Sequence, residues 1–587
     1  MLDKLRQLAE RLEANGDLAP PHYDWLRIAW LIDLDGEGRF VGFVRTPDEE
    51  GRKARGKRFL APHVQRTSGV EANLLADRAD YALGFVAPDA SERTERAHGA
   101  FLALVKECAR VTNEPTVATV ARFLETLDLA ALDLPQDLKP RDNVTFRVDG
   151  VLSIELPSVQ SFWARVCEPR GEEAQCLVCG QRRPPAQRHP VKIKGIPGPQ
   201  RGTGMALVSA NEEAFESYGQ KASLISPVCD ECAQRYAKAL NALRDKDDSH
   251  IVVGPLVYYF WTREEVAFSP GRLLSSPEPD EVRALVDSVR TGRARDTTAD
   301  VTPFYAAALS ASGGRVVVRD WLETTVEQVK QSLARWFRLQ SVTGPWGETE
   351  ARHFPLRGYW RDQTNSWVEG LADAVLPKVG GRRNIDQVNP NVPKVLLGTA
   401  LHGDPLPMCL LSDAVARCRA EREVTQPRAA LIKVVLLSNQ PYTEQEDNNM
   451  EQLDPENRTP AYLCGRLLGV LEGIQRAALP GIQATILDRF YGTASSAPAS
   501  VFGTLLRGAQ AHLGKLRKTN EPAFLALQRR LEEVLVPLPC FPAALSLPEQ
   551  GLFALGYYHQ RAADRAAAIA HKQASAAKEQ PESAESQ

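Results

Sequence analysis

Two pairs of cysteines in this chain have the spacing of metal ligands. They are Cys176-Leu-Val-Cys179, which is followed by Gly180, and Cys229-Asp-Glu-Cys232. A Cys-x-x-Cys knuckle can place both thiolates on one cation, and two knuckles complete a tetrahedral zinc site. The glycine suits the tight backbone turn that such knuckles need. We therefore predict a structural zinc ion held by Cys176, Cys179, Cys229 and Cys232.

Other chemistry at these cysteines is less well supported. Four thiolates leave no open position on zinc, which disfavours a catalytic metal. Neither pair follows the strand-to-helix junction that redox Cys-x-x-Cys motifs use. The remaining alternative is four reduced cysteines that merely occur in pairs.

The segment between the two cysteine pairs is basic and rich in glycine. From Ala174 to Asn211 it contains no acidic residue. Glycines let backbone amides approach a ligand closely, and a cationic strip of this kind suits phosphate backbones. It is not a nucleotide-binding P-loop, because it lacks the GK[ST] ending. A solvated loop remains the alternative. The basic residues are Arg182, Arg183, Arg188, Lys192, Lys194 and Arg201, with His189 beside them.

A second basic strip lies near the N-terminus. It precedes the short turn Thr67-Ser68-Gly69 and then Asn73. Asparagine side chains commonly contact base edges, and lysines and arginines bind the phosphates of a duplex. An ordinary surface loop is an equally good interpretation of the bare sequence. The basic residues are Arg52, Lys53, Arg55, Lys57, Arg58 and Arg66.

We find none of the familiar catalytic motifs. The sequence has no GxSxG, HExxH, Walker A or HD motif, and no DxD pair suited to two-metal nuclease chemistry. The ten histidines are scattered. This pattern favours a binding protein over an enzyme.

The bulk composition is that of a large soluble protein. At 587 residues the chain is too long for one hydrophobic core, and its net charge of −3 does not announce a nucleic-acid binder. No apolar run is long enough for a membrane span, and the N-terminal segment does not resemble a signal peptide. The cysteines are expected to be reduced and the protein cytoplasmic.

The chain order predicts an α+β fold: a mixed N-terminal region with a zinc-knuckle insertion, followed by a C-terminal helical bundle. Strands are expected at 28–33 and 39–44 around the Asp35-Gly36 turn, and at 144–148 and 251–261. Apolar residues spaced three and four apart predict the bundle helices after Leu463. The predicted domains are 1–140, 141–270, 271–445 (mainly helical) and 446–565 (the bundle), with a disordered tail at 566–587.

Long stretches of the chain resemble a known family, the large subunits of the type I-C CRISPR surveillance complex, Cascade. The similarity is carried by LAERLEANGDLAPPHY (8–23), RTSGVEANLLADRADYALG (66–84) and RHPVKIKGIPGPQRGTGMALVSANEEAFESYG (188–219). It continues in RFYGTASSAPASVFGTLLRGAQAHLGKL (489–516) and FPAALSLPEQGLFALGYYHQR (541–561). Chance similarity between helical bundles would not reproduce the loops.

The resemblance implies a non-catalytic subunit of a guide-RNA ribonucleoprotein. Such a subunit recognises a short protospacer-adjacent motif (PAM) in double-stranded DNA, promotes unwinding and R-loop formation, holds the displaced strand, and recruits a separate helicase–nuclease. Its implied partners are target DNA, the guide-RNA-bound backbone subunits, the 5′-handle subunit and small helical subunits. This division of labour is physically reasonable, because guide pairing supplies most of the sequence specificity.

Carried onto this sequence, the resemblance implies two DNA-binding regions. PAM contact is expected at the turn that contains Arg66, Thr67, Ser68, Gly69 and Asn73, with Lys57 and Arg58 on nearby phosphates. Duplex contact or strand separation is expected at Arg188, Lys192, Lys194, Gln200 and Arg201. Members of the family often lack one cysteine of each pair, so zinc would be a local feature of this branch.

One hypothesis about translation and two alternative functions follow from the sequence. In this family a small subunit can be translated from an internal start, and Met450 precedes the bundle at a suitable place. The runner-up function is a zinc-stabilised nuclease or nucleotide hydrolase with an unrecognised site. A third is a structural interaction protein without DNA contact, which predicts a flat response of affinity to salt.

Overall fold

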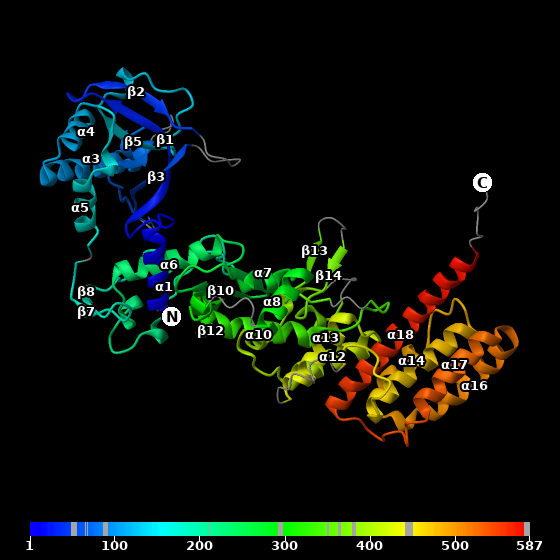
Figure 1. Cartoon of the computed structure of the whole chain (residues 1–587). Coiled ribbons are helices and arrows are strands. Elements are labelled where there is room, and N and C mark those ends of the chain that lie inside the picture. Colours follow the sequence, from blue (N-terminus) through cyan, green and yellow to red (C-terminus); the bar gives the residue numbers. More distant parts are fainter. Residues whose placement is uncertain are drawn as a thin grey trace, which may run out of the picture. The chain divides into compact units, whose positions relative to one another are not determined.

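The computed structural model forms two compact units (Figure 1). Unit 1 comprises Met1–Gly195, Gln200–Ala242 and Ser312–Val316, and unit 2 comprises Ile196–Pro199, Leu243–Ala311 and Val317–Gln587. The structure describes residues 1–47, 56–64, 66, 69–85, 92–168, 170–209, 212–291, 297–348, 352–361, 366–378, 383–440 and 450–579. The mixed N-terminal region and the helix-rich C-terminal region confirm the predicted α+β fold.

Unit 1 is built on a six-stranded mixed sheet around the long strand β1 (Tyr23–Leu34). The first half of β1 pairs antiparallel with β3 (Lys57–Pro62), and its second half lies between β2 (Phe40–Arg45, antiparallel) and β5 (Asn143–Val148, parallel). Strands β4 (Ala76–Arg78) and β6 (Val151–Leu152) pair antiparallel with β5.

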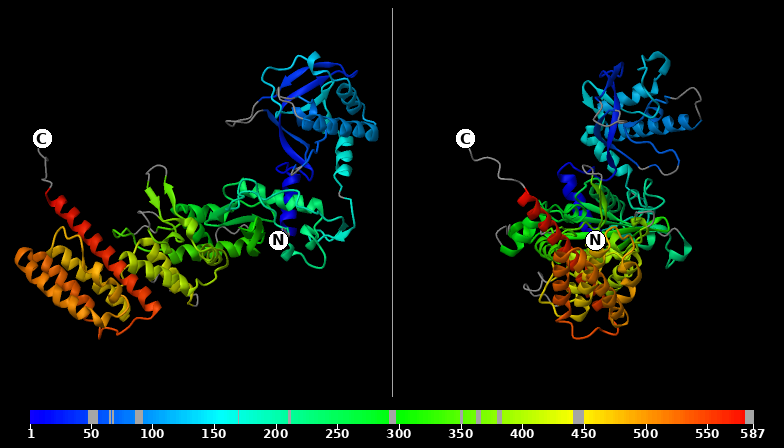
Figure 2. Two further views of the ribbon diagram at one scale, coloured as in Figure 1. Left: turned by 180° about the vertical axis from the view of Figure 1, so that it is seen from behind. Right: turned by 90° about the vertical axis from the view of Figure 1, so that its right-hand side faces the viewer.

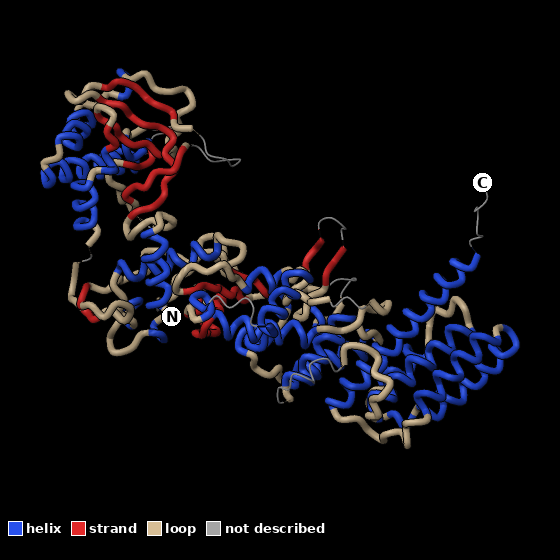
Figure 3. Tube along the Cα trace, in the orientation of Figure 1, coloured by secondary structure: helices blue, strands red, loops and turns tan. Residues whose placement is uncertain are grey.

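Two helices cover one face of this sheet, as Figure 3 shows. Helices α3 (Glu92–Thr112) and α4 (Pro115–Glu125) bury apolar residues against β5. Phe101 and Phe123 each pack on Phe146 of β5. The sheet and these helices therefore share one hydrophobic core, which fixes where β3 and the turn after it lie.

The second part of unit 1 carries the cysteine pairs. Helix α1 (Leu2–Ala14) opens the chain, and α5 (Pro157–Val166) leads from the sheet into the hairpin formed by β7 (Ala174–Gln175) and β8 (Arg182–Arg183). Helix α6 (Asp230–Arg244) begins directly after Cys229, the first member of the second cysteine pair. Arg235 of α6 forms an ion pair with Glu13 of α1, with Nε and Oε1 3.2 Å apart.

Unit 2 begins with a four-stranded sheet in the order β12-β11-β10-β9. Its strands are β9 (His250–Val253), β10 (Leu256–Thr262), β11 (Pro303–Ser312) and β12 (Arg315–Thr325). The helices that share its core are α7 (Pro270–Ser275), α8 (Pro279–Thr291) and α10 (Val326–Gln340). The middle helices are α11 (Asn391–His402), α12 (Met408–Glu421) and α13 (Gln426–Ser438), and β13 (Tyr359–Arg361) and β14 (Ser366–Val368) form a separate hairpin.

The C-terminal bundle contains the predicted helices. They are α14 (Pro460–Ala478), α15 (Ile486–Ala494), α16 (Phe502–Thr519), α17 (Glu521–Leu535) and α18 (Leu547–Glu579). Both views in Figure 2 place α18 along α14, and α18 also packs on α12 and α13. The bundle and the middle helices therefore share the apolar surface of α18.

Two details differ from the predicted elements. The predicted strand 251–261 is two strands, because Gly254 adopts a left-handed φ of +57° and turns the chain between β9 and β10. The predicted domain boundary at 140 falls inside one sheet, because β5 pairs directly with β1. A turn formed by a single glycine and a long-range strand pairing leave little trace in local patterning.

Glycines allow the close approach of α14 and α18. A Cβ at Gly465 would lie well inside van der Waals contact with the carbonyl oxygen of Phe553, and one at Gly556 would meet that of Tyr462. We predict that Gly465→Ala forces the helices apart and lowers the free energy of unfolding by about 1–3 kcal/mol, the usual cost of overpacking. Thermal unfolding monitored by circular dichroism measures this.

The matched control is Gly514→Ala on α16. A Cβ at Gly514 meets nothing within 4 Å, so alanine there should raise stability by roughly 0.5–1 kcal/mol through helix propensity. Equal melting temperatures for the two variants would contradict the inferred contact.

Candidate nucleic-acid interface and thiol cluster

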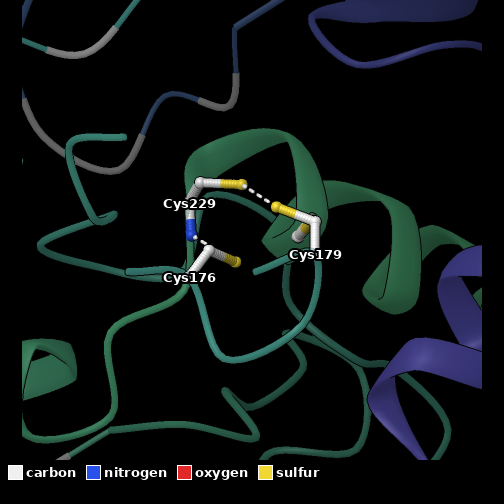
Figure 4. A group of neighbouring side chains, drawn as sticks. Cys176, Cys179 and Cys229 are labelled. Atoms are coloured by element: carbon white, nitrogen blue, oxygen red, sulfur yellow. Dashed lines mark hydrogen bonds between the residues drawn. The ribbon is translucent and has the colours of Figure 1, made fainter. Parts of the chain in front are cut away.

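The two cysteine pairs meet in space. The four Sγ atoms of Cys176, Cys179, Cys229 and Cys232 all lie within 4.8 Å of one another. Figure 4 shows Cys176 and Cys179 on the loop side and Cys229 at the start of the helix, with 3.9 Å between the sulfurs of Cys179 and Cys229. Three of the four cysteines are buried. The predicted clustering of these residues is confirmed.

Backbone geometry around the first pair is that of a knuckle. Gly180 has a φ of +72° and donates its N–H to the Cys176 carbonyl over 2.9 Å. The N–H groups of Val178 and Cys229 point at the Cys176 sulfur, at 3.4 and 3.3 Å. Two backbone N–H groups are therefore directed at the sulfur of one candidate metal ligand.

Like charges that are close together oppose one another, so ionising one thiol of the cluster disfavours ionising its neighbours. Hydrogen bonding with Cys232 lowers the pKa of Cys229 to about 5, whereas the same contact raises the pKa of Cys232 well above its usual range. Burial raises the pKa of Cys179. A divalent cation would remove this conflict, and four soft sulfur donors without an open position are compatible with zinc.

Helix α6 ties the thiol cluster to the N-terminal turn. Cys232 lies in its first turn, and one stripe of the helix presents Gln234 and Lys238 to the chain before β1. Gln234 Oε1 accepts the N–H of His22 over 2.8 Å. The Lys238 ammonium donates to the carbonyls of Ala19, Pro20 and Tyr23 at 3.2, 2.7 and 2.8 Å. Burial lowers the pKa of Lys238 to about 8.

The glycine-rich basic segment is an ordered loop, which we call the basic loop (residues 188–205). Ile193 and Met205 exchange backbone hydrogen bonds of 2.8 and 2.9 Å across its base. Asn241 of α6 brackets one strand of the loop: its Oδ1 accepts the N–H of Lys194 over 2.9 Å, and its Nδ2 donates to the Lys192 carbonyl over 3.0 Å. These bonds fix the backbone and leave the side chains free to project.

The predicted contact residues of the basic loop are available to a ligand. Arg188, Lys194, Gln200 and Arg201 are exposed, and Lys192 is half-buried. Within the described part of the chain, no hydrogen bond or ion pair engages these five side chains. By contrast, Arg183 on β8 forms an ion pair with Glu231 at 2.9 Å. The structure therefore distinguishes cations that are exposed on the basic loop from cations that form ion pairs within the fold.

The predicted PAM-side residues divide into two groups. Lys57 and Arg58 are exposed at the start of β3, on opposite faces of the strand, and Gly69 is exposed with a φ of +88°. Arg58 stands directly opposite Arg27 of β1, a basic neighbour that sequence spacing did not indicate. Thr67 and Ser68 lie outside the described residues, as do Arg52, Lys53 and Arg55.

Arg66 and Asn73 have internal partners. The Arg66 guanidinium donates to the buried Asp77 carboxylate and lies 3.9 Å from the centroid of the Tyr81 ring. Asn73 is 4% exposed, and its Oδ1 accepts the N–H of Val64 over 2.9 Å. Both side chains shape the turn, Asn73 from a buried position and Arg66 with 23% of its side chain exposed. That they contact DNA directly stays a prediction.

Comparison with known protein families identifies the class to which this chain belongs. The model of the CRISPR-associated protein family Cas_Csd1 matches residues 5–564, nearly the whole chain, and the protein belongs to that family. The match supports a Cascade-type CRISPR protein. No curated protein matches the chain. Among the described residues, no helix is long and apolar enough to cross a membrane.

The anchor of the basic loop should weaken in acid. His189 hydrogen-bonds the hydroxyl of buried Tyr236 at 2.8 Å, and burial lowers the pKa of His189 to about 4. In an opened loop, solvated His189 would have its ordinary pKa near 6.5. Between pH 4 and 6.5 the open form therefore binds more protons than the closed form. We predict that amide protection of Ile193 and Met205 falls as the pH drops from 6.5 to 4, by up to tenfold per pH unit.

Hydrogen exchange, expressed as protection factors, measures this effect. His189→Gln keeps a polar side chain but does not titrate, so its protection should be nearly constant over the same range. A wild-type loop whose protection is also constant would show that His189 does not hold it.

Proposed function

We propose that this protein is the non-catalytic large subunit of a type I-C RNA-guided DNA surveillance complex, in which it recognises the PAM in duplex DNA. One observation carries the proposal. The basic loop presents Arg188, Lys192, Lys194 and Arg201, whose side chains have no hydrogen-bond or ion-pair partner among the described residues, on a backbone fixed by Asn241. Membership of the CRISPR-associated family supports it. Promotion of unwinding and R-loop formation, and recruitment of a separate helicase–nuclease, belong to the same proposal.

The chemistry of the basic loop suits the duplex backbone. Each phosphate that a lysine or arginine neutralises releases counterions, so affinity is gained without base recognition. Gln200 lies beside the turn at Gly314 and can donate and accept hydrogen bonds at a base edge. The protein then supplies position and a short readout, whereas guide pairing supplies sequence specificity.

The turn after β3 is the proposed PAM-side element. Lys57 and Arg58 would contact phosphates, and Gly69 would allow close approach of the backbone. The Arg66 side chain holds this turn through Asp77, and the Asn73 side chain holds it through Oδ1, which accepts the Val64 N–H over 2.9 Å. Their loss would therefore act through the shape of the turn.

We also propose that the thiol cluster binds a structural zinc ion. Cys176 and Cys179 lie before the basic loop and Cys229 and Cys232 after it, so the metal would close the long insertion at its base. The ion would supply rigidity and no reaction step. The residues that face DNA are all outside the cluster.

The proposed small subunit that starts at Met450 has a structural counterpart. Met450 has a φ of +70° and stands just before the bundle. The Glu451 carbonyl accepts the N–H of Thr343 over 2.8 Å, so this segment also touches the middle region. A separately translated bundle would keep α14 against α18, and the faces of α18 that pack on α12 and α13 would be uncovered.

The DNA-binding prediction concerns salt dependence. Replacing Lys192, Lys194 and Arg201 together by alanine should weaken duplex binding and reduce the slope of log affinity against log salt by about 0.9 for each phosphate that is no longer neutralised. Asn241→Ala should reduce the same slope, because the loop would no longer hold its lysines in place. Fluorescence anisotropy of the assembled complex, repeated over a series of salt concentrations, measures the slope for both variants. The duplexes used differ only in the flanking trinucleotide.

Arg110→Ala is the control, because Arg110 is exposed on α3 but already paired with Glu107 at 2.6 Å. An unchanged slope in the triple variant would refute the proposed role of the basic loop. Cleavage of labelled duplex by the purified protein with Mg²⁺ would refute the non-catalytic role and favour a nuclease.

The zinc prediction concerns metal content. We expect about one zinc ion per chain, because two knuckles form one tetrahedral site. Cys229→Ser should abolish this zinc and lower the melting temperature, whereas Cys409→Ser, at an exposed cysteine outside the cluster, should change neither. Mass spectrometry of the native protein and metal analysis after dialysis measure the content. The site would be refuted if wild-type protein without bound metal had the same melting temperature as the protein before the metal was removed.

A further inference from the structure

A tight turn after the basic loop presents an aromatic side chain entirely to solvent. The turn runs from Ser217 to Gln220, with a hydrogen bond of 2.9 Å from the Gln220 N–H to the Ser217 carbonyl. Its central residues, Tyr218 and Gly219, have φ values of +51° and +72°. The Tyr218 side chain is 100% exposed, so it contributes no packing to the fold.

Tyrosine is an unfavourable residue at this position. Two-residue turns with positive φ at both central positions favour asparagine, aspartate or glycine, because a bulky side chain crowds the backbone in the left-handed region. A strained and fully exposed aromatic residue is therefore not explained by folding. Such strain is concentrated at functional sites.

A second aromatic residue stands at the base of the same segment. Phe215 is 39% exposed, and the Arg315 guanidinium lies 3.8 Å from the centroid of its ring. Arg315 follows the Gly313-Gly314 turn and bonds the Ser209 carbonyl at 3.5 Å. Arg315 thus packs on the partly exposed Phe215 ring, three residues before the fully exposed Tyr218.

The charges around these rings select the partner. Residues 212–221, which we call the acidic aromatic segment, contain three carboxylates, Glu212, Glu213 and Glu216, and one ammonium, Lys221, a net charge of −2. The Arg315 guanidinium on Phe215 brings the local net charge to −1. Carboxylates beside the rings repel phosphates and attract lysine and arginine side chains. Exposed aromatic residues with a charged rim are typical of protein-binding hot spots.

We infer that the acidic aromatic segment docks on a basic protein surface with an apolar slot, in which Tyr218 is the anchor. Within the proposed function, on which this inference rests for its assembly, a guide-RNA-holding subunit has the required chemistry, because a protein that binds RNA is rich in exposed cations. Glu213 and its neighbours would form the rim of the contact, and Phe215 would close the side of the slot.

The test uses Tyr218→Asn in the full chain. Asparagine suits the turn better than tyrosine, so folding should be preserved or improved while the ring is removed. We expect binding to the guide-RNA-loaded complex, purified without this subunit, to weaken by at least about tenfold, the order expected when an interface anchor is removed. Tyr218→Phe should retain most of the affinity. Glu213→Lys should slow association, because it reverses a rim charge.

Two measurements keep this test separate from that of the proposed function. Duplex binding by the isolated chain should be unchanged in Tyr218→Asn, and Val536→Ser, which alters a valine 85% exposed elsewhere, should assemble normally. A photoreactive benzoylphenylalanine at position 218 should cross-link to a protein subunit of the complex. Cross-links to nucleic acid alone, or assembly of Tyr218→Asn at wild-type affinity, would overturn the inference.

Discussion

The order of unit 1 beyond its sheet depends on what is bonded to helix α6. Its first turn holds Cys232, with Cys229 directly before it. Its middle holds the chain before β1 through Gln234 and Lys238, and its last turn holds the basic loop through Asn241. Most of these bonds join side chains to backbone groups, because a loop rich in glycine and proline has few backbone partners of its own. A single rigid helix thereby gives a fixed geometry to segments that would otherwise be independent loops.

The basic residues of this protein fall into two groups, those paired with carboxylates inside the fold and those displayed on the basic loop. Arg66 is paired with a buried carboxylate, and Arg235 with Glu13, so neither contributes much to the outer field. The lysine and arginine side chains of the basic loop have no such partner within the described ranges, although the whole chain has a net charge of only −3. Local surplus of unpaired cations, and not the total, determines where a polyanion binds. The acidic aromatic segment after the loop has the opposite sign, which lets neighbouring elements select different partners.

The sequence predicted the parts that depend on local spacing. The two Cys-x-x-Cys pairs converge, the bundle helices form, and the strands around Asp35-Gly36 pair, because short-range patterning is sufficient for each. What it could not show were roles that depend on distant partners. Asn73 has the type of a base-contacting residue, but it is buried, and its side-chain Oδ1 accepts the Val64 N–H. Asn241, which holds the basic loop, belongs to no motif and becomes visible only when the helix and loop are placed together.

Helix α18 has a mechanical consequence. This one uninterrupted helix packs along α14 in the bundle and also on α12 and α13. Its Gly551 fits between Leu411 of α12 and Ile432 of α13. Its Tyr558 hydroxyl donates to the Thr343 carbonyl over 2.8 Å. Because one helix packs on both groups of helices, the bundle cannot move relative to the middle helices unless those apolar surfaces slide past one another. The helical half of the chain should accordingly behave as one cooperative block, and a calorimeter should record its melting as a single transition.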